Sequence, residues 1–192
     1  MKALIAGAGI GGLASALFLH RAGVEVEIYE QSPEVRELGV GINLLPHAVQ
    51  ALASLGLLGP LDSSGVRTRE LIYLNRFGQM VWREPRGLDA GYRVPQYSIP
   101  RSRLLGLLHK AVLDRIGPEC VHVSRRFTAH SADSTGVMIN LTDANANGFE
   151  ARGDILIGAD GIHSLVRASL YPGEGAPIWN GVMIWRGVME WP

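Results

Sequence analysis

The sequence of 192 residues has a single cysteine and no excess of charge of either sign. Because Cys120 stands alone, the chain can form neither an internal disulfide nor a metal site built from a cysteine cluster. The 18 basic residues balance the 18 acidic residues, so the formal net charge is zero. This balance gives no indication of a nucleic-acid or membrane-surface partner. There is no internal repeat, and a hydrophobic content of 47% is typical of a globular chain.

The sequence also lacks an apolar run long enough for a membrane span. Its most apolar stretch, residues 3–19, reads ALIAGAGIGGLASALFL. A spanning helix needs about 20 apolar residues, and each glycine inside a helix costs about 1 kcal/mol relative to alanine. The tripeptide ASA at 14–16 imitates a signal-peptide cleavage site, but the spacing of the glycines favours another interpretation. With no targeting signal, we expect a cytoplasmic protein without a membrane partner.

That spacing is the pattern G-x-G-x-x-G, formed by Gly7, Gly9 and Gly12 directly after the apolar run ALIA. In nucleotide-binding βαβ units this pattern makes a tight turn into a helix, whose free N–H groups and positive dipole end face a pyrophosphate. A helix ending at Gly23 and a second strand, VEVEIYE at 24–30, would follow. The alternative is an apolar strand and helix whose glycines serve only for packing.

The acidic end of the second strand supports the nucleotide interpretation. Glu30 shares the strand face of three apolar residues, whereas Glu25 and Glu27 point the other way. A carboxylate on the apolar side of a strand needs a hydrogen-bonding partner. Glu30 comes 18 positions after Gly12, near the spacing of about 20 residues at which an acid binds the hydroxyls of a ribose.

The middle of the chain predicts further helices and strands. A loop at 38–43 leads into a helix that begins at Pro46 and ends before Gly56. Residues 69–83 alternate as two strands around a turn at 77–79, and residues 86–97 look irregular. A helix over 102–116, with Ser102 as its N-cap, is followed by a meander at 120–142 with strands at 120–123, 126–131 and 136–142. Residues 150–160 return as one strand that enters a helix.

The stretch DILIGADGIHSLVR at 154–167 discriminates between cofactors. An apolar strand runs into a corner at Asp160 and Gly161, which brings a carboxylate and open backbone close to a bound dinucleotide. An acid at this position suits hydroxyls and ordered water better than a phosphate, because like charges repel. The first glycine pattern alone is also found in NAD-dependent dehydrogenases, which this corner disfavours.

Taken together, GAGIGG, Glu30 and GADGIHSLVR resemble the FAD-dependent aromatic hydroxylases, the single-component flavoprotein monooxygenases related to p-hydroxybenzoate hydroxylase and salicylate hydroxylase. The similarity continues through EQSPEVRELGVGINLLPHAVQALASLGL, YSIPRSRLLGLL and WRGV, and so covers nearly the whole chain. The sequences of the stretches VWREPRG, PQYSI and GADGIHSLVRASLYP are most similar to those of the phenazine-hydroxylating members.

This resemblance implies an α/β fold. It would be a Rossmann-like FAD-binding fold of the glutathione-reductase and p-hydroxybenzoate-hydroxylase type, with an antiparallel meander and the beginning of a β-sheet substrate domain. The FAD-binding domain would comprise residues 1–70 and 98–170. The substrate domain would comprise residues 71–97 and 171–192 and would be truncated, with its sheet starting at residues 185–187.

The resemblance also implies cofactor-binding residues. Gly7, Gly9 and Gly12 match the loop at the ADP pyrophosphate, and Glu30 matches the residue that holds the adenosine ribose. The other expected contacts are Arg36, Gly41 in the stretch at 39–43 beside the flavin, Arg101, and the pair Asp160 and Gly161, which is linked to both FAD and NAD(P)H use. Arg167 would be a structural arginine. No residue is assigned as a catalytic acid or base, and no metal is expected.

The implied reaction is hydride transfer from NADH or NADPH to FAD, followed by dioxygen addition and hydroxylation of an aromatic substrate through a flavin hydroperoxide. The substrate would be a small aromatic molecule such as a phenazine or an aromatic carboxylate. Members of the family are longer, and their second FAD motif, a Gly-Asp-Ala corner, has no counterpart here. The alternative is therefore a truncated, non-catalytic FAD-binding fragment. Exposed apolar surface around 179–191 would favour self-association.

Overall fold

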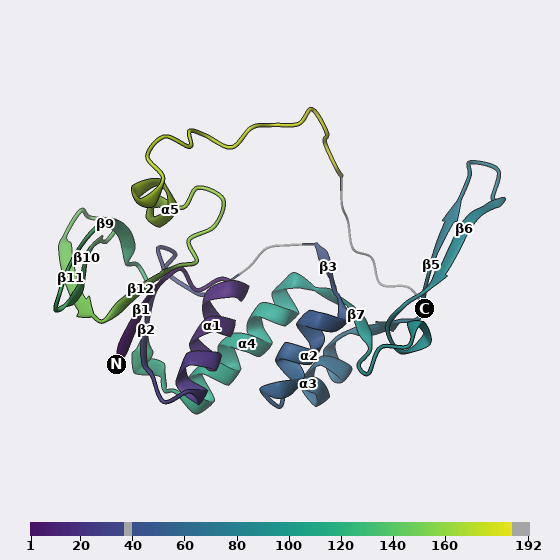
Figure 1. The fold of residues 1–192 in the computed structure, drawn as a ribbon, viewed down its shortest axis with the longest axis horizontal. Coiled ribbons are helices and arrows are strands. Elements are labelled where there is room, and N and C mark those ends of the chain that lie inside the picture. The colour runs from purple at the N-terminus through teal and green to yellow at the C-terminus, as the bar shows by residue number, and fades with distance from the viewer. Residues whose placement is uncertain (37–39, 186–192) are drawn as a thin grey trace. The chain divides into compact units, whose positions relative to one another are not determined.

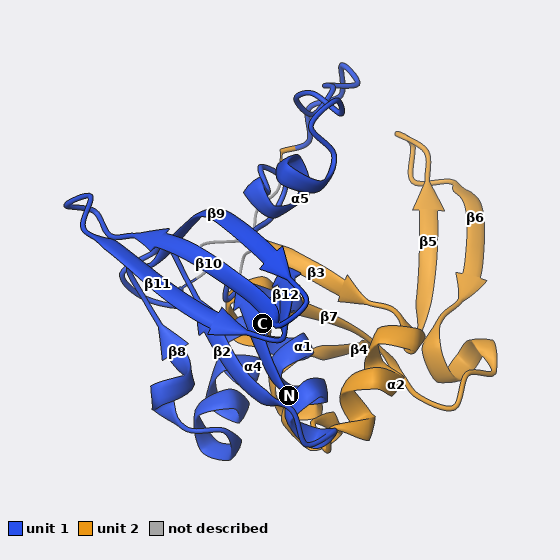
Figure 2. Cartoon of the chain, turned by 60° about the vertical axis from the view of Figure 1, so that its left-hand side comes forward, with its two compact units in different colours: residues 1–37, 105–184 blue, residues 38–104, 185–192 orange. Residues whose placement is uncertain are grey.

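The computed structural model describes residues 1–36 and 40–185 (Figure 1). The chain divides into two compact units, one of residues 1–37 and 105–184 and the other of residues 38–104 and 185–192 (Figure 2). Within the described residues, no helix combines the length and the apolar character that crossing a bilayer requires. The division into a cofactor domain and a substrate domain stays a prediction, because the compact units are defined by packing alone.

The first unit is organised around a parallel sheet with strand order β12-β1-β2-β8. Its strands are β1 (Lys2–Ala6), β2 (Glu25–Tyr29), β8 (Val121–His122) and β12 (Ile155–Gly158). The central strand β1 is almost completely buried, as is usual for parallel strands covered on both faces. Helix α1 (Ile10–Arg21) connects β1 to β2 and ends two residues before Gly23, which has a positive φ of 79°.

An antiparallel meander with strand order β11-β10-β9 packs against this sheet. It consists of β9 (Arg126–Asp133), β10 (Gly136–Thr142) and β11 (Gly148–Gly153). Alternate residues of β10 are buried, as its sequence pattern predicts. They share a hydrophobic cluster with Leu4 and Ala6 of β1 and with Phe127 at the start of β9. The meander is therefore held to the sheet by one continuous core.

Two predictions about this region are wrong. Residues 120–123 do not belong to the meander, because β8 pairs in parallel with the end of β2. Residues 150–160 form two strands rather than one, since β11 pairs with β10 and β12 pairs with β1. The chain changes sheets at Asp154, whose N–H donates to the Lys2 carbonyl at 2.8 Å and whose carboxylate accepts from the Lys2 N–H at 2.6 Å. Sequence periodicity contains no information on which strand a segment pairs with.

Helix α4 (Arg101–Arg115) lies in the first unit from Leu105 onward. It begins one residue earlier than predicted, so Ser102 lies inside the first turn and is not the N-cap. Helix α5 (Leu165–Leu170) follows β12, as expected, and its N-cap is Ser164.

The second unit contains an antiparallel sheet with strand order β3-β7-β4 and a separate hairpin. The sheet consists of β3 (Gly41–Leu44), β4 (Val66–Thr68) and β7 (Gln96–Pro100), with helices α2 (Pro46–Ser54) and α3 (Leu58–Ser64). The hairpin consists of β5 (Glu70–Leu74) and β6 (Met80–Pro85), followed by a short 3-10 helix, Gly87–Ala90. The helix beginning at Pro46 and the two strands of the hairpin are confirmed.

Other predictions for the second unit are only partly right. Of the stretch at 38–43, expected to be a loop, residues 38–39 lie outside the described part of the chain. From Gly41 the chain forms strand β3, which pairs with β7 as far as Leu44. The stretch at 86–97, expected to be irregular, contains the 3-10 helix and the first residues of β7. The sequence did not predict α3 or β4. Short strands such as β4 depend on pairing with distant residues and leave little local pattern.

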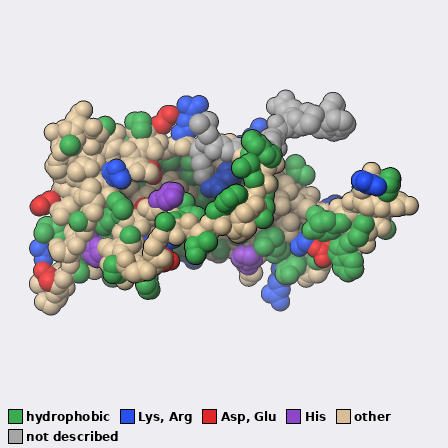
Figure 3. All heavy atoms as spheres, turned by 90° about the horizontal axis from the view of Figure 1, so that it is seen from above, with side chains coloured by type: hydrophobic (Ala, Val, Ile, Leu, Met, Phe, Trp, Pro, Cys, Tyr) green, Lys and Arg blue, Asp and Glu red, His purple; other side chains and the backbone are tan. Residues whose placement is uncertain are grey.

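Exposed apolar side chains gather in two segments. The β5–β6 hairpin exposes Phe77, Val81 and Trp82, and Figure 3 shows hydrophobic side chains on it at the right. The second segment, residues 178–185, has no regular secondary structure, and Trp179 and Trp185 are 74% and 89% exposed. Trp185, expected to begin a sheet, is therefore irregular here, and residues 186–187 lie outside the described part of the chain.

The packing of α1 on β1 gives a first testable prediction. A Cβ atom on the buried Gly12 would lie 1.9 Å from the Gly7 carbonyl oxygen, whereas one on the exposed Gly11 would meet nothing within 4 Å. Gly12→Ala is therefore expected to destabilise the first unit by about 1–3 kcal/mol or more. Gly11→Ala, the matched control, is expected to stabilise it by about 0.5–1 kcal/mol through helix propensity. Urea unfolding of both variants measures the difference, and equal midpoints would contradict the packing.

Candidate nucleotide-binding site

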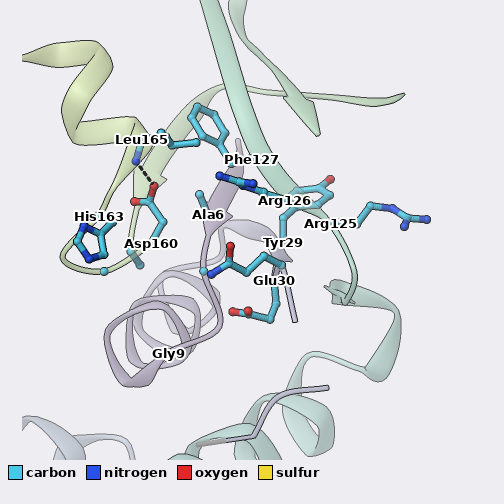
Figure 4. Close-up of a pocket in the computed structure, with 14 residues that line it drawn as sticks. Ala6, Gly9, Tyr29, Glu30, Arg125, Arg126, Phe127, Asp160, His163 and Leu165 are labelled. Carbon is cyan, nitrogen blue, oxygen red and sulfur yellow. Dashed lines mark hydrogen bonds between the residues drawn. The ribbon is translucent and has the colours of Figure 1, made fainter. Parts of the chain in front are cut away.

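A pocket of about 290 Å³ lies at the carboxyl ends of β1, β2 and β12 (Figure 4). All of its lining residues belong to the first unit. It brings together five of the residues predicted from sequence, namely Gly7, Gly9, Glu30, Asp160 and Gly161. In open α/β sheets, ligands bind in the crevice outside the carboxyl ends of the strands, so the pocket is where this fold would hold a nucleotide.

The glycine turn leaves the floor of the pocket free of side chains. Gly7 has a φ of 104°, which side chains rarely allow, and its N–H donates to the Tyr29 carbonyl at 2.8 Å. A Cβ on Gly7 would lie 2.4 Å from the carbonyl oxygen of Ala159. The next element, α1, has Gly9 as its N-cap and no capping side chain. Its first N–H groups are therefore available to an anion.

The Glu30 carboxylate is held in place by backbone donors. Oε2 accepts a hydrogen bond from the Ala8 N–H at 2.9 Å, and Oε1 accepts one from the Ser32 N–H at 2.9 Å. Among the described residues, no lysine or arginine forms an ion pair with it. A carboxylate has about four acceptor positions, so two of them stay available for the hydroxyls of a ribose.

The Asp160 carboxylate, which lines the pocket, also has partners within its own corner. It accepts a hydrogen bond from the Ser164 hydroxyl, and its Oδ2 accepts from the N–H groups of Leu165 at 2.8 Å and Val166 at 3.2 Å. Ser164 in turn accepts from the Arg167 N–H at 2.9 Å. Asp160 therefore fixes the corner to the start of α5, and Ala159, Asp160 and Gly161 of this corner line the pocket.

The remaining predicted residues do not line this pocket. Arg36 is exposed and forms an ion pair with Glu34 at 3.3 Å. Gly41 is the first residue of β3, and the N–H of Arg101, the first residue of α4, donates to the Val40 carbonyl at 3.2 Å. Gly41 and Arg101 both belong to the second unit. Gly12 does not line the pocket either, but its lack of a side chain allows α1 to pack closely against the Gly7 carbonyl.

The structure adds a wall that sequence reasoning missed, formed by Tyr29 and residues 125–127. The Tyr29 hydroxyl donates to Glu27, and the ring stacks on His122 with the ring centres 4.9 Å apart. Burial, together with the hydrogen bond to Glu27, raises the pKa of Tyr29 far above its ordinary value. The phenol is therefore neutral at physiological pH. His163 also lines the pocket, but it is exposed, and no described residue forms a hydrogen bond with its side chain that would mark it as a base.

The charged side chains of Lys2 on β1 and Glu27 on β2 neutralise each other. Burial of Glu27 would raise its pKa, but hydrogen bonds from Lys2 and Tyr29 outweigh burial and lower the pKa of this carboxyl. The Lys2 ammonium lies 2.8 Å from Glu27. The charges of Lys2 and Glu27 are thus paired with each other, and Glu30 and Asp160 are the acidic residues that line the pocket.

Comparison with known proteins shows to which proteins this chain is similar. Residues 1–183 match a family model described as an FAD binding domain. The chain is 45% identical over 174 residues to a phenazine 1,6-dicarboxylic acid hydroxylase, PhzS, of Lysobacter antibioticus, covering 88% of this chain and 42% of that protein. It is 32% identical over 179 residues to an FAD-dependent urate hydroxylase of Klebsiella pneumoniae, covering 87% of this chain and 42% of that protein.

Solved structures show the same relation. The structure of Klebsiella pneumoniae HpxO complexed with FAD and uric acid has a TM-score of 0.71 and 30% identity, and the match covers 88% of this chain and 41% of that one. The flavin-dependent monooxygenase PieE, in complex with FAD and substrate, shares the fold with a TM-score of 0.76 at 24% identity, over 88% of this chain and 32% of that one. The predicted α/β fold of the p-hydroxybenzoate-hydroxylase type is thereby confirmed.

These matches agree with the geometry of the pocket, in which a side-chain-free turn and a ribose-compatible carboxylate meet at the strand ends. They cover less than half of the length of the curated relatives. They give no support to the alternative of an NAD-dependent dehydrogenase. The chain belongs to the FAD binding domain family, and its relatives are FAD-dependent aromatic hydroxylases, as the sequence resemblance predicted.

Proposed function

We propose that this chain binds FAD as the cofactor-binding part of an aromatic hydroxylase that uses NADH or NADPH and dioxygen. The observation that carries the proposal is the convergence of the Gly7 turn and the Glu30 carboxylate in one pocket of the first unit. The residues present fit the cofactor, because added Cβ atoms at Gly7 and Gly12 would collide with backbone in the cradle. A cytoplasmic location stays a prediction.

Each part of the site has a defined task in this proposal. The start of α1 binds the pyrophosphate with backbone N–H groups, and Glu30 orients the adenosine ribose by accepting from its hydroxyls. The Asp160 corner keeps open backbone beside the cofactor. Bound FAD would accept a hydride and activate dioxygen, and the protein contributes binding, orientation and the exclusion of water. Arg36, Gly41 and Arg101 are further proposed cofactor contacts.

The substrate class follows from the relatives. The 45% identity to a phenazine 1,6-dicarboxylic acid hydroxylase supports a small aromatic substrate of the phenazine or aromatic-carboxylate type. The urate hydroxylase, at 32% identity, acts on a smaller heterocycle. We infer that the present chain binds the nucleotide part of the FAD that such a reaction requires, whichever ring system is hydroxylated.

A second candidate function is FAD binding without turnover by these residues alone. It is supported by the exposure of Trp179 and Trp185, which a complete substrate domain would be expected to cover. NADH oxidation in the presence of FAD and a phenazine carboxylate, coupled to formation of hydroxylated product, distinguishes the two candidates. Formation of hydroxylated product is the outcome expected of the first candidate and would contradict the second. FAD binding without coupled NADH oxidation would support the second candidate.

Binding of the cofactor is tested by the visible spectrum of the chain after addition of FAD and desalting. We expect retained flavin absorption with a protein-perturbed spectrum. Glu30→Gln is expected to raise the Kd for FAD about tenfold to a hundredfold, because a charge-assisted hydrogen bond to a ribose hydroxyl contributes about 1.5–3 kcal/mol. Titration followed by flavin fluorescence measures the Kd.

The matched control for this test is Glu25→Gln, because Glu25 is an exposed acid at the start of β2, the strand that precedes Glu30, and does not line the pocket. It is expected to bind FAD like the unaltered chain. Failure of the unaltered chain to bind FAD in titration would contradict the proposed function. Equal affinities of the two variants would contradict the role of Glu30 while leaving FAD binding intact.

The exposed apolar segments give a prediction about association. Phe77 and Trp82 of the hairpin region are 71% and 57% exposed, and both strands of the hairpin lack a further pairing partner among the described residues. We expect the chain to self-associate through these surfaces. Sedimentation velocity should show oligomers whose proportion falls in the variant Val81→Lys/Trp82→Lys. A monodisperse monomer of the unaltered chain would contradict this prediction.

A further inference from the structure

One wall of the pocket is not explained by the glycine turn, Glu30 or the Asp160 corner. It is formed by the segment of residues 124–127, which comprises the end of the connection from β8 and the first two residues of β9. Residues 125–127 of this segment line the pocket. The Ser124 N–H donates to the Ser32 carbonyl at 2.9 Å, and the Arg125 N–H donates to the Glu30 carbonyl at 2.8 Å. Ser124 has a φ of 53°, an uncommon conformation for a residue other than glycine. The segment is therefore held firmly against the strand end that carries Glu30.

The two arginines of this segment differ in their partners. The Arg125 guanidinium lies 3.6 Å from the centre of the Phe149 ring and donates to the Ser124 carbonyl at 2.9 Å. The Arg126 side chain is exposed and forms no hydrogen bond, ion pair or ring contact with any residue that the structure describes. In Figure 4, Arg125 extends away from the other labelled residues, whereas Arg126 extends toward the side of the pocket that holds Asp160.

The order of the groups along the pocket matches the order of the parts of a nucleotide. Figure 4 shows Gly9 at one side, Glu30 in the middle and Arg126 beyond Glu30. With the pyrophosphate at the start of α1 and the ribose at Glu30, the base would be next in line. A guanidinium is planar and weakly hydrated, and it stacks on aromatic rings. A purine offers such a ring, and base stacking requires no particular hydrogen-bond pattern.

We propose that Arg126 is a positioning residue for the adenine of bound FAD and stacks its guanidinium on the base. The inference rests on the proposed binding of FAD. Arg126 would thereby make the pocket select ligands that contain adenine, such as FAD and ADP, over a flavin mononucleotide, which has no adenine. Arg125 does not have this role, because its guanidinium is already stacked on Phe149.

The test is the affinity of the chain for ADP and FAD in the variants Arg126→Ala and Arg126→Lys. Both variants are expected to raise the Kd for both ligands about fivefold to thirtyfold, because this factor corresponds to the free energy of stacking a guanidinium on an aromatic ring away from water. Lysine is expected to behave like alanine, because it keeps the positive charge but lacks the planar guanidinium. A second readout is the fluorescence of etheno-ADP, which stacking on Arg126 should perturb in the unaltered chain and not in Arg126→Ala.

The matched control is Arg152→Ala, because Arg152 is an exposed arginine of β11 in the same unit that does not line the pocket. It should bind ADP like the unaltered chain, and thermal unfolding of all variants verifies that each is folded. Unchanged ADP affinity in Arg126→Ala would overturn the inference. Full affinity in Arg126→Lys would also overturn it, because charge alone would then suffice, as for a phosphate contact. Absence of both ADP and FAD binding in the unaltered chain would instead reject the proposed function itself.

Discussion

The close approach of three backbone segments at Gly7, Gly12 and Ala159 is the constraint on which the rest of the first unit depends. A side chain at Gly12 would collide with the Gly7 carbonyl, and a side chain at Gly7 would collide with the Ala159 carbonyl. Backbone hydrogen bonds hold this arrangement, since the Gly7 N–H donates to Tyr29 and the Ala159 N–H donates to Ala6, both at 2.8 Å. The ends of β2 and β12 are thereby fixed on either side of β1.

Two carboxylates are placed at these strand ends, and their surroundings give them different tasks. Glu30 accepts from two backbone N–H groups and keeps acceptor capacity for a ligand. Asp160 uses its oxygens to fix the corner and the first turn of α5. Neither carboxylate is neutralised by an arginine or lysine among the described residues. Backbone N–H groups, joined at Asp160 by the Ser164 hydroxyl, stabilise both charges.

All residues that line the candidate nucleotide pocket belong to one of the two units, whereas the expected flavin contacts Gly41 and Arg101 belong to the other. This separation is consistent with the chain's relation to longer FAD-dependent hydroxylases, of which it spans less than half. The chemistry in such enzymes belongs to the cofactor, and the protein determines where the cofactor and substrate lie. Exposed tryptophans at 179 and 185 mark apolar surface that the described residues leave uncovered.

The sequence by itself determined the local parts of the site. The glycine spacing, the parity of Glu30 on its strand and the Asp-Gly corner are short-range patterns, because backbone conformation and side-chain alternation act over a few residues. They were sufficient to predict the βαβ unit, its cofactor class and five residues that line the pocket.

Only the tertiary structure decided how distant segments pair. It moved residues 121–122 from the meander to the parallel sheet and divided residues 150–160 between two sheets. It also showed that Asp160 accepts hydrogen bonds from the first N–H groups of α5, and that Arg126 faces the pocket while its neighbour Arg125 stacks on Phe149. These outcomes depend on hydrogen bonds and packing between residues far apart in the chain, and no local pattern specifies which segments will meet.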